Sequence, residues 1–312
     1  MKTFYSTIYT KTGAATAILA AIALSACNPA TLSDGQSDAI DGKGTVTFDI
    51  SASKSARMLT RAVVSDIPVT DAAGSAVGAI SLSAAWVVIK EIELQHEGDG
   101  EHGVDDANQV EYVGPFAVDL LTGDSFPPFP QVSIDTGNYV DVEFSIEKLE
   151  DEDLIGLGDL PTEITSSLLN YSVYLEGTYS SADQVTYVSI PFSLSNDQSQ
   201  EFELSGSQSS KGFVVDDTGI NDILVAFRLN EWFRFNDIET NSDSIDFETA
   251  VSSGAIVLDS NTNSSVMAVI EDNMKSSAEY GEDDDDNGQL DDDEDDDEFE
   301  NENENENEHE ND

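Results

Sequence analysis

The sequence is poor in the residues from which several common kinds of site are built. It holds one cysteine, Cys27, and three histidines among 312 residues. A single cysteine excludes a disulfide within the chain and a zinc site built from several cysteines. Three histidines leave little from which a catalytic triad or a histidine-ligated zinc site could be assembled. Any chemistry must therefore rest on other residue types.

Basic residues are also scarce. The chain has 12 Lys and Arg against 64 Asp and Glu, which gives a formal net charge of −52. Such a field repels nucleic acid and anionic lipid and attracts cations. We therefore expect no nucleic-acid partner. Adaptation to a salty medium is an alternative reason for the charge of the body, because an acidic surface with few lysines stays soluble there.

The N-terminal apolar stretch, residues 14–24, is too short for a membrane span, which takes about 20 apolar residues. Lys2 and Lys11 precede it, and Leu24-Ser-Ala-Cys27 follows. A basic start, an apolar middle and a small-residue cleavage site are typical of a bacterial secretory signal. The Leu-Ser-Ala-Cys ending resembles the lipobox of bacterial lipoproteins.

This resemblance implies cleavage before Cys27, a diacylglyceryl thioether on its sulfur and usually a third acyl chain, such as palmitate, on its new amino group. Two or three acyl chains anchor a protein stably in a membrane. No free thiol would remain, which also excludes thiol catalysis. Asn28 stands where an aspartate would mark retention in the inner membrane. The expected location is therefore the bacterial cell envelope, lipid-anchored at the outer membrane.

The body of the chain shows the period-2 alternation of half-buried strands. It recurs in residues 45–50, 80–94, 140–146, 171–179, 188–194 and 223–229, with polar turns between them. In the longest stretch, we expect one apolar face interrupted only by Lys90, made of Ile80, Leu82, Ala84, Trp86, Val88, Ile92 and Leu94. The pattern predicts a mainly β protein, an antiparallel β-sandwich.

One stretch has a different period. Val266, Ile270, Met274 and Ala278 recur every four residues, behind capping residues 263–265, which predicts one amphipathic helix over 262–280. Residues 282–312 then hold 20 acids and no Lys or Arg, and we expect this acidic tail to be disordered without a ligand. The expected layout is a signal (1–26), a lipidated tether (27–43), a body (44–261) with a possible subdomain boundary near 150–170, the helix, and the tail (281–312).

The tail begins with a match to an EF-hand calcium loop over residues 283–294. The glycine of the sharp turn is Gly288, and the aliphatic residue that packs beneath the loop is Leu290. The expected calcium ligands occupy positions one, three, five, seven, nine and twelve, namely Asp283, Asp285, Asn287, Gln289, Asp291 and Glu294.

Calcium suits this loop because it is a hard cation that takes six to eight oxygen ligands. A single unpaired loop of this kind resembles the one-helix calcium loops of extracellular modules such as dockerin segments. We therefore expect weak binding, with a dissociation constant of about 10⁻⁴–10⁻³ M. The alternative is a solvated acidic tail that binds cations diffusely, since an Asp-rich run fills most of the ligand positions by composition alone.

Trp232 lies among aromatic and polar residues in Asn230-Glu-Trp-Phe-Arg-Phe-Asn236. Aromatics beside Asn, Glu and Arg suit stacking on sugar rings, which makes a carbohydrate-binding lipoprotein an alternative function. Closure of the core at a strand end is the other interpretation, and the one that we favour for this residue.

No complete catalytic constellation is present. Ser51-Ala-Ser-Lys54 fits one motif of penicillin-interacting serine enzymes, but the partner motif Ser-Asp-Asn is missing and Lys-Thr-Gly occurs only in the signal. His96 and His102 flank an acidic loop that reads either as a metal site or, more simply, as a solvated hairpin. Residues 84–94, 116–123 and 135–139 resemble a group of uncharacterised bacterial lipoprotein domains with β-sandwich folds, which implies no activity.

The sequence thus predicts a non-enzymatic, lipid-anchored envelope protein with a weak calcium loop and a display or binding role. Its expected partners are the membrane, through the anchor, and either a carbohydrate or another envelope protein.

Overall fold

A computed structural model describes residues 42–52, 64–71, 73–96, 110–205, 213–217, 220–235 and 246–282. Contacts divide the chain into Met1–Asp38 and Ala39–Asp312, and all the described residues belong to the second unit. Cys27 and the loop 283–294 lie outside the described residues. Among the described residues, no helix has the length and apolar character that a membrane crossing requires.

The described body is an antiparallel β-sandwich in its main pairings, as the alternation predicts. The smaller sheet has the order β15-β12-β1-β6, from Ala278–Glu282, Ile220–Phe227, Lys43–Ala52 and Val132–Asp135. The main path of the larger sheet is β10-β7-β3-β8-β9-β14-β13, from Gln200–Ser205, Gly137–Ile146, Ala76–His96, Val173–Ser181, Ile190–Asn196, Ala255–Asp259 and Val251–Ser252. Off this path lie β2 (Val64–Thr70), β4 (Val110–Asp119), β5 (Ser125–Phe126) and β11 (Phe213–Val215). Two pairings, β1 with β12 and β9 with β14, are parallel.

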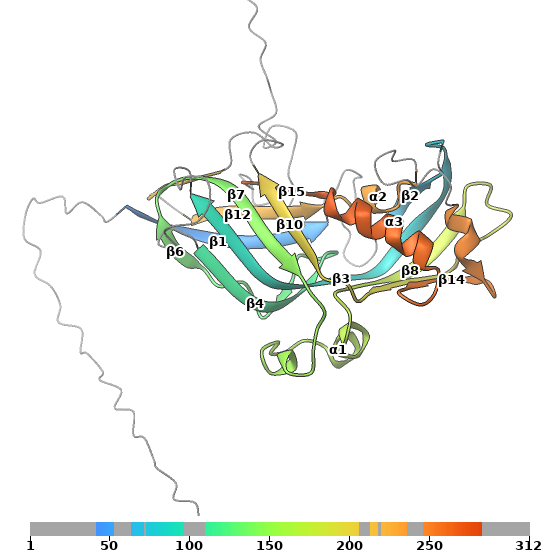
Figure 1. The fold of residues 1–312 in the computed structure, drawn as a ribbon, viewed down its shortest axis with the longest axis horizontal. Helices are drawn as coiled ribbons and strands as arrows, with labels where there is room; N and C mark the ends of the chain where they lie inside the picture. The colour runs from blue at the N-terminus through green and yellow to red at the C-terminus, as the bar shows by residue number, and fades with distance from the viewer. Residues whose placement is uncertain are drawn as a thin grey trace, which may run out of the picture. The chain divides into compact units, whose positions relative to one another are not determined.

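The main core lies between the smaller sheet and the inner face of the larger one. Apolar residues of β1 point into it at every second position, Val46, Phe48 and Ile50, each at most 2% exposed. Beyond the smaller sheet, the core is covered by α2 (Leu229–Trp232), α3 (Ser264–Lys275) and the 3-10 turn η3 (Phe247–Ala250) (Figure 1). The inner face is therefore buried by a layer that is part sheet and part helix.

The long strand β3 does not keep one apolar face, which corrects the expectation for residues 80–94. Register shifts occur between Leu82 and Ala84 and between Ile89 and Glu91. Each bulge adds a residue to one strand and so reverses which side chains point inward. Ile80 and Leu82 belong to the main core, as do Ala85, Val87, Ile89, Ile92 and Leu94, whereas Trp86 and Val88 point to the opposite face.

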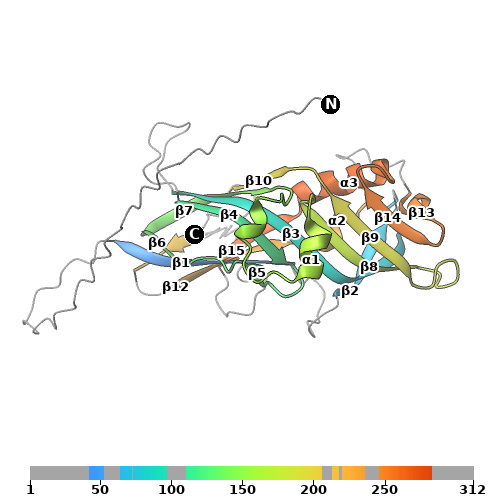
Figure 2. The same ribbon diagram turned by 90° about the horizontal axis from the view of Figure 1, so that it is seen from below.

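A second, smaller core covers Trp86 and Val88 on the outer face of the larger sheet. The covering segment, residues 147–172, contains the 3-10 turn η1 (Asp153–Ile155) and the helix α1 (Thr162–Leu168), which Figure 2 shows over β3. It contributes Leu149, Leu157, Leu160 and Leu168. Since β7 and β8, on either side of this segment, both pair with β3, residues 150–170 are an excursion from one sheet and do not separate two subdomains.

The C-terminal helix is shorter than 262–280. It ends at Lys275, and residues 278–282 form β15, antiparallel to β12, with Phe227 opposite Ala278. Ser276, Ser277 and Gly281 are poor helix formers, and the edge of β12 offers backbone hydrogen bonds that a longer helix would leave unmade. A strand, and not the entering helix of an EF-hand, therefore leads to Asp283.

Candidate functional site

The bulge after Ile89 turns glutamates outward in the last part of β3. Glu91 and Glu93 face away from the core. Ile92, which lies between them, and Leu94, which follows Glu93, are fully buried. Neighbouring strands repeat the pattern, with Glu143 beside buried Phe144 on β7 and Glu203 beside buried Phe202 on β10. Period-2 alternation thus gives these strands an apolar inner face and an acidic outer face.

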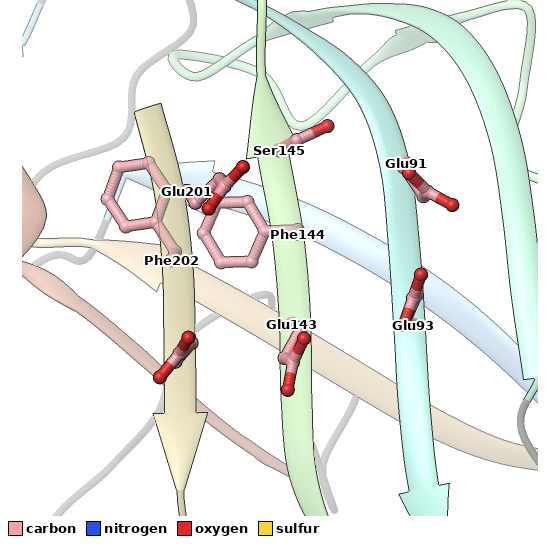
Figure 3. Close-up of a pocket in the computed structure, with 8 residues that line it drawn as sticks. Glu91, Glu93, Glu143, Phe144, Ser145, Glu201 and Phe202 are labelled. Carbon is pink, nitrogen blue, oxygen red and sulfur yellow. The ribbon is translucent and has the colours of Figure 1, made fainter. Parts of the chain in front are cut away.

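The outward glutamates stand in direct register across four strands. Glu93 pairs with Glu111 of β4 on one side and with Glu143 on the other, and Glu143 pairs with Glu203. These four residues, Glu111, Glu93, Glu143 and Glu203, are called the glutamate row. In the adjacent row, Ser145 lies between Glu91 and Glu201 (Figure 3). Residues directly opposite have Cβ atoms about 4.5–5.5 Å apart, so the carboxylates are close neighbours.

A groove of ≈ 210 Å³ runs between these side chains. It is lined by Glu91, Glu93, Glu143, Phe144, Ser145, Glu201, Phe202 and Glu203. The rings of Phe144 and Phe202 stack with centroids 4.5 Å apart. Pockets for organic ligands have about 300–1,000 Å³, so this groove suits ions or single side chains. The Ser145 hydroxyl oxygen is buried there with no hydrogen-bond partner within the described part of the chain.

Two carboxyl groups of the glutamate row, Glu143 and Glu111, have raised pKa values. Burial, followed by the charges of Glu203, Asp141 and Glu201, raises the pKa of Glu143. The Gln95 amide donates a hydrogen bond of 3.0 Å to the Glu143 carboxylate. A hydrogen bond with Glu91, then burial and the charge of Glu91, raises the pKa of Glu111. Glu143 and Glu111 therefore hold a proton more tightly than an isolated glutamate does.

The basic side chains of the described residues pair elsewhere. Six Lys and Arg residues lie in the described ranges, and all six form ion pairs, Lys43–Asp135, Lys90–Asp153, Lys148–Glu150, Arg228–Glu279, Arg234–Glu231 and Lys275–Asp272. None of these six pairs includes a glutamate of the row. The negative potential of the glutamate row is therefore not offset by these basic side chains, and it attracts cations from solution.

The row does not form a compact metal centre. Within the described ranges, no three or more His, Cys, Asp or Glu side chains converge on one point where a metal ion could bind. The carboxylates instead stand in a line along one sheet face. Such a line can hold cations between neighbouring carboxylates, or alternate with the Lys and Arg side chains of a partner.

Trp232 lies in the core, the interpretation that the sequence favours, and not on an exposed surface where a sugar could stack. Its side chain is fully buried, its indole N–H donates a 2.6 Å hydrogen bond to Ser277 Oγ, and its ring packs edge-on against Phe227. Asn273 of α3 donates a hydrogen bond to its backbone carbonyl. Trp232 closes the core beneath α3, and the carbohydrate alternative loses the residue on which it rested.

Of the other residues considered as site candidates, the structure describes His96 but not the expected lipidation or calcium residues. Cys27, the six expected calcium ligands and His102 all lie outside the described ranges. His96 is half-buried, and its ring packs edge-on against Tyr139 with centroids 5.2 Å apart. Sequence reasoning missed the glutamate row, although alternation such as Glu91-Ile-Glu-Leu94 predicts outward glutamates on each strand. The strand pairing that aligns them is not visible in the sequence.

Comparison with known proteins places the chain in no family. No family model matches it, and no curated protein matches it. Among solved structures, it is similar to MbnP from Methylosinus trichosporium, with 14% sequence identity over 61% of this chain and 77% of that one, and a TM-score of 0.30. A likeness this weak carries no argument about function, which must be inferred from the chain's own residues.

Proposed function

We propose that this protein is a non-enzymatic, lipid-anchored protein of the bacterial cell envelope that binds divalent cations. The loop 283–294 is its specific calcium site, with ligands Asp283, Asp285, Asn287, Gln289, Asp291 and Glu294. The glutamate row is a weaker, open cation-binding face on the body. Cys27 carries the lipid anchor.

The observation that supports cation binding most directly is the alignment of four glutamates across four strands. Like charges directly opposite each other destabilise a sheet, on the scale of about 0.2–1 kcal/mol per pair. Proteins break such rules chiefly at functional sites. Cations lying between neighbouring carboxylates would offset the repulsion, and the groove has room for them.

Calcium titration by calorimetry tests the loop. The protein is residues 28–312, in magnesium and ~0.15 M salt, which screens diffuse binding. We expect one saturable site with a dissociation constant of about 10⁻⁴–10⁻³ M, lost in Gly288→Val and in Glu294→Ala. The same non-saturating heat in all three proteins would contradict the loop and leave the tail as a diffuse polyanion.

The row is tested with the double variant Glu93→Gln/Glu143→Gln. We expect the saturable site to remain and the weaker, salt-sensitive component of calcium binding to fall. Glu150→Gln/Glu152→Gln, which removes two exposed carboxylates of the covering segment, is the matched control. Equal losses in the two double variants would show that the row acts only through net charge.

The anchor is tested separately by labelling cells with a fatty-acid analogue. We expect label on the wild-type protein and none on Cys27→Ser, together with release of that variant from the membrane fraction. Unlabelled wild-type protein would contradict the anchor and leave the calcium proposal standing.

A further inference from the structure

A second row of outward side chains crosses the same four strands as the glutamate row, two residues away on each strand. It consists of Val113, Glu91, Ser145 and Glu201, each directly opposite the next. The two rows together are called the acidic face, part of which Figure 3 shows. With strands about 4.8 Å apart and alternate residues about 7 Å apart, the face measures roughly 14 Å across by 7 Å along the strands. Its carboxylates therefore form lines of separate acceptors and do not surround one point.

Exposed apolar side chains adjoin the acidic face on the β4 side. Val113 is 70% exposed, and Ile155 of η1 is 92% exposed. The segments that carry them are in contact, because a Cβ built on Gly156 would lie 3.8 Å from Cδ of Pro115. Val113 stands two residues before Pro115, and Ile155 immediately precedes Gly156. Such side chains favour a partner that has apolar groups of its own, because a simple cation gains nothing from them.

The groove of the acidic face holds a polar group without a partner. The hydroxyl oxygen of Ser145 is buried between Glu91 and Glu201 and forms no hydrogen bond within the described part of the chain. The large majority of buried polar side-chain atoms in proteins do have a partner. An ammonium or guanidinium group that entered the groove would donate to this oxygen and to the neighbouring carboxylates together. The groove, ≈ 210 Å³, has room for one such side chain.

The charge of the acidic face restricts its partner to a basic one. Nucleic acid and anionic lipid are repelled by it. A second copy of this chain is disfavoured too, because the chain has a net charge of −52 and the six Lys and Arg side chains of the described ranges are engaged in ion pairs. The partner is therefore a different protein that presents Lys or Arg side chains.

The spacing of the acidic face indicates the form of that partner. Outward residues recur about every 7 Å along β3, which is the repeat of alternate side chains in any extended segment. We propose that the acidic face is the docking surface for an extended basic segment of another protein, with Lys or Arg at alternate positions and an apolar residue over Val113 and Ile155. This inference rests on the proposed role of the glutamate row as a cation-binding face, and it names the partner of that face. The contact is small, so the complex is weak and salt-sensitive.

Peptide binding measured by fluorescence anisotropy tests the proposal. Every core residue of the described part lies between Val46 and Tyr280, so residues 28–312 keep the folded body. The probe is a dye-labelled nine-residue peptide with lysine at its third, fifth and seventh positions, leucine at both ends and serine elsewhere, in EDTA and ~0.15 M salt. We expect Glu93→Gln/Glu143→Gln to weaken binding about fivefold to tenfold, because two carboxylates that pair with lysine are lost. A peptide with glutamate in place of lysine should not bind.

The matched control is Glu163→Gln/Asp272→Asn, which removes one exposed carboxylate from α1 and one from α3, both outside the acidic face. It makes the same change in net charge, and we expect it to alter the affinity by less than about twofold. Equal weakening in the two double variants would show that only net charge attracts the peptide, which would overturn the docking.

Val113→Ala/Ile155→Ala tests the apolar part of the surface without changing charge. The comparison uses a second peptide with serine in place of both leucines. We expect the wild-type protein to bind the leucine peptide about fivefold more tightly than the serine peptide, and the variant to bind the two within about twofold. Equal affinities for the two peptides in the wild-type protein would assign the face to simple polycations and overturn a protein partner.

Zero-length cross-linking locates the bound peptide. A carbodiimide joins a peptide lysine to a carboxylate that it contacts, and mass spectrometry identifies the glutamate. We expect cross-links at Glu91, Glu93, Glu143 and Glu203, and far fewer at Glu163. Cross-links spread evenly over the exposed carboxylates would overturn the docking.

The docking and the cation-binding role fail in different ways. Loss of the weak calcium component in Glu93→Gln/Glu143→Gln, with unchanged peptide affinity, would overturn the docking and leave the cation-binding face. Unchanged calcium binding together with unchanged peptide affinity in this variant would overturn both roles of the face.

Discussion

The outer face of the larger sheet has two regions that differ in covering. Around the middle of β3, Trp86 and Val88 point outward and are buried beneath residues 147–172. Beyond the bulge, Glu91 and Glu93 point outward and line an open groove. The same strand, β3, forms both regions. They differ in covering because the bulge after Ile89 changes the outward side chains from apolar to acidic. The covering segment lies only where burial removes apolar surface from water.

The two regions meet at Lys90. Its ammonium pairs with Asp153 of η1, with only 20% and 13% of the two side chains exposed. The same carboxylate accepts a 2.7 Å hydrogen bond from the backbone N–H of Glu150. This ion pair fixes the covering segment at the border of the acidic region, so the comparison can be tested on both sides of it.

The largest expected effect is in the covered region. Trp86→Ala should lower the free energy of unfolding by about 3–5 kcal/mol, because it removes a buried aromatic ring and leaves a cavity under the covering segment. Denaturant unfolding measures the loss. Ile155→Ala is the control, since this side chain is 92% exposed and its removal should change stability by less than about 0.5 kcal/mol. Equal effects would mean that residues 147–172 do not bury Trp86.

The next effect is at the border. Lys90→Met should cost about 1.5–3 kcal/mol, because it leaves the half-buried Asp153 carboxylate without its cation. Amide exchange within residues 147–172 should also become faster. Lys148→Met breaks an exposed pair 3.9 Å long and should cost at most about 1 kcal/mol. A smaller loss at Lys90 than at Lys148 would show that the border pair does not hold the segment.

A smaller effect of opposite sign is expected in the open region. Glu143→Gln should stabilise the protein at pH 7 by about 0.2–1 kcal/mol, because it removes a charge opposed to Glu93 and Glu203. A carboxyl whose pKa is raised by folding stabilises the fold below its unfolded pKa and loses that contribution as pH rises through the folded pKa. The pKa of Glu143 is raised above 4.5, so the gain of the variant should shrink as pH falls from 7 toward 4.5. A pH-independent gain, or the same gain in Glu152→Gln, would contradict this account.

The smallest effect is at Val113, which is opposite Glu91 in the row adjacent to the glutamate row and is 70% exposed. Val113→Ala should change the unfolding free energy by less than about 0.5 kcal/mol. This variant separates exposure from residue type, because Val113 is apolar yet uncovered. A loss above about 1 kcal/mol would indicate that a further part of the chain covers it.

Alternation in the sequence was sufficient for the main strands and the fold class. It located β1, β3, β7, β8, β9 and β12, because each has one apolar and one polar face. It did not locate the other strands, among them β4, where Gly114-Pro115 interrupts the pattern, and β10, which carries Glu203. The bulges of β3 were also missed, since a register shift arises from pairing with neighbouring strands and leaves no local signal.

The two candidate sites also differ in whether the sequence alone can predict them. The calcium loop is a local motif, so it can be read from consecutive residues, but a four-residue period could not distinguish a helix at Ala278 from a strand that pairs with β12. Predicting the glutamate row would have required knowing that Glu93 pairs with Glu111 and Glu143, and that Glu143 pairs with Glu203. These alignments are decided by the packing of the whole sheet.

The parallel pairing of β1 with β12 bears on when the chain can fold. Thr45 lies opposite Ile220, and the Thr47 hydroxyl donates to the Asp222 carboxylate across 175 residues of chain. Contacts between such distant residues form late and slowly, because a large loop must close first. The first strand of the body must therefore wait for nearly the last one to be made. The smaller sheet therefore cannot be completed until β12, more than 160 residues after β1, has been synthesised.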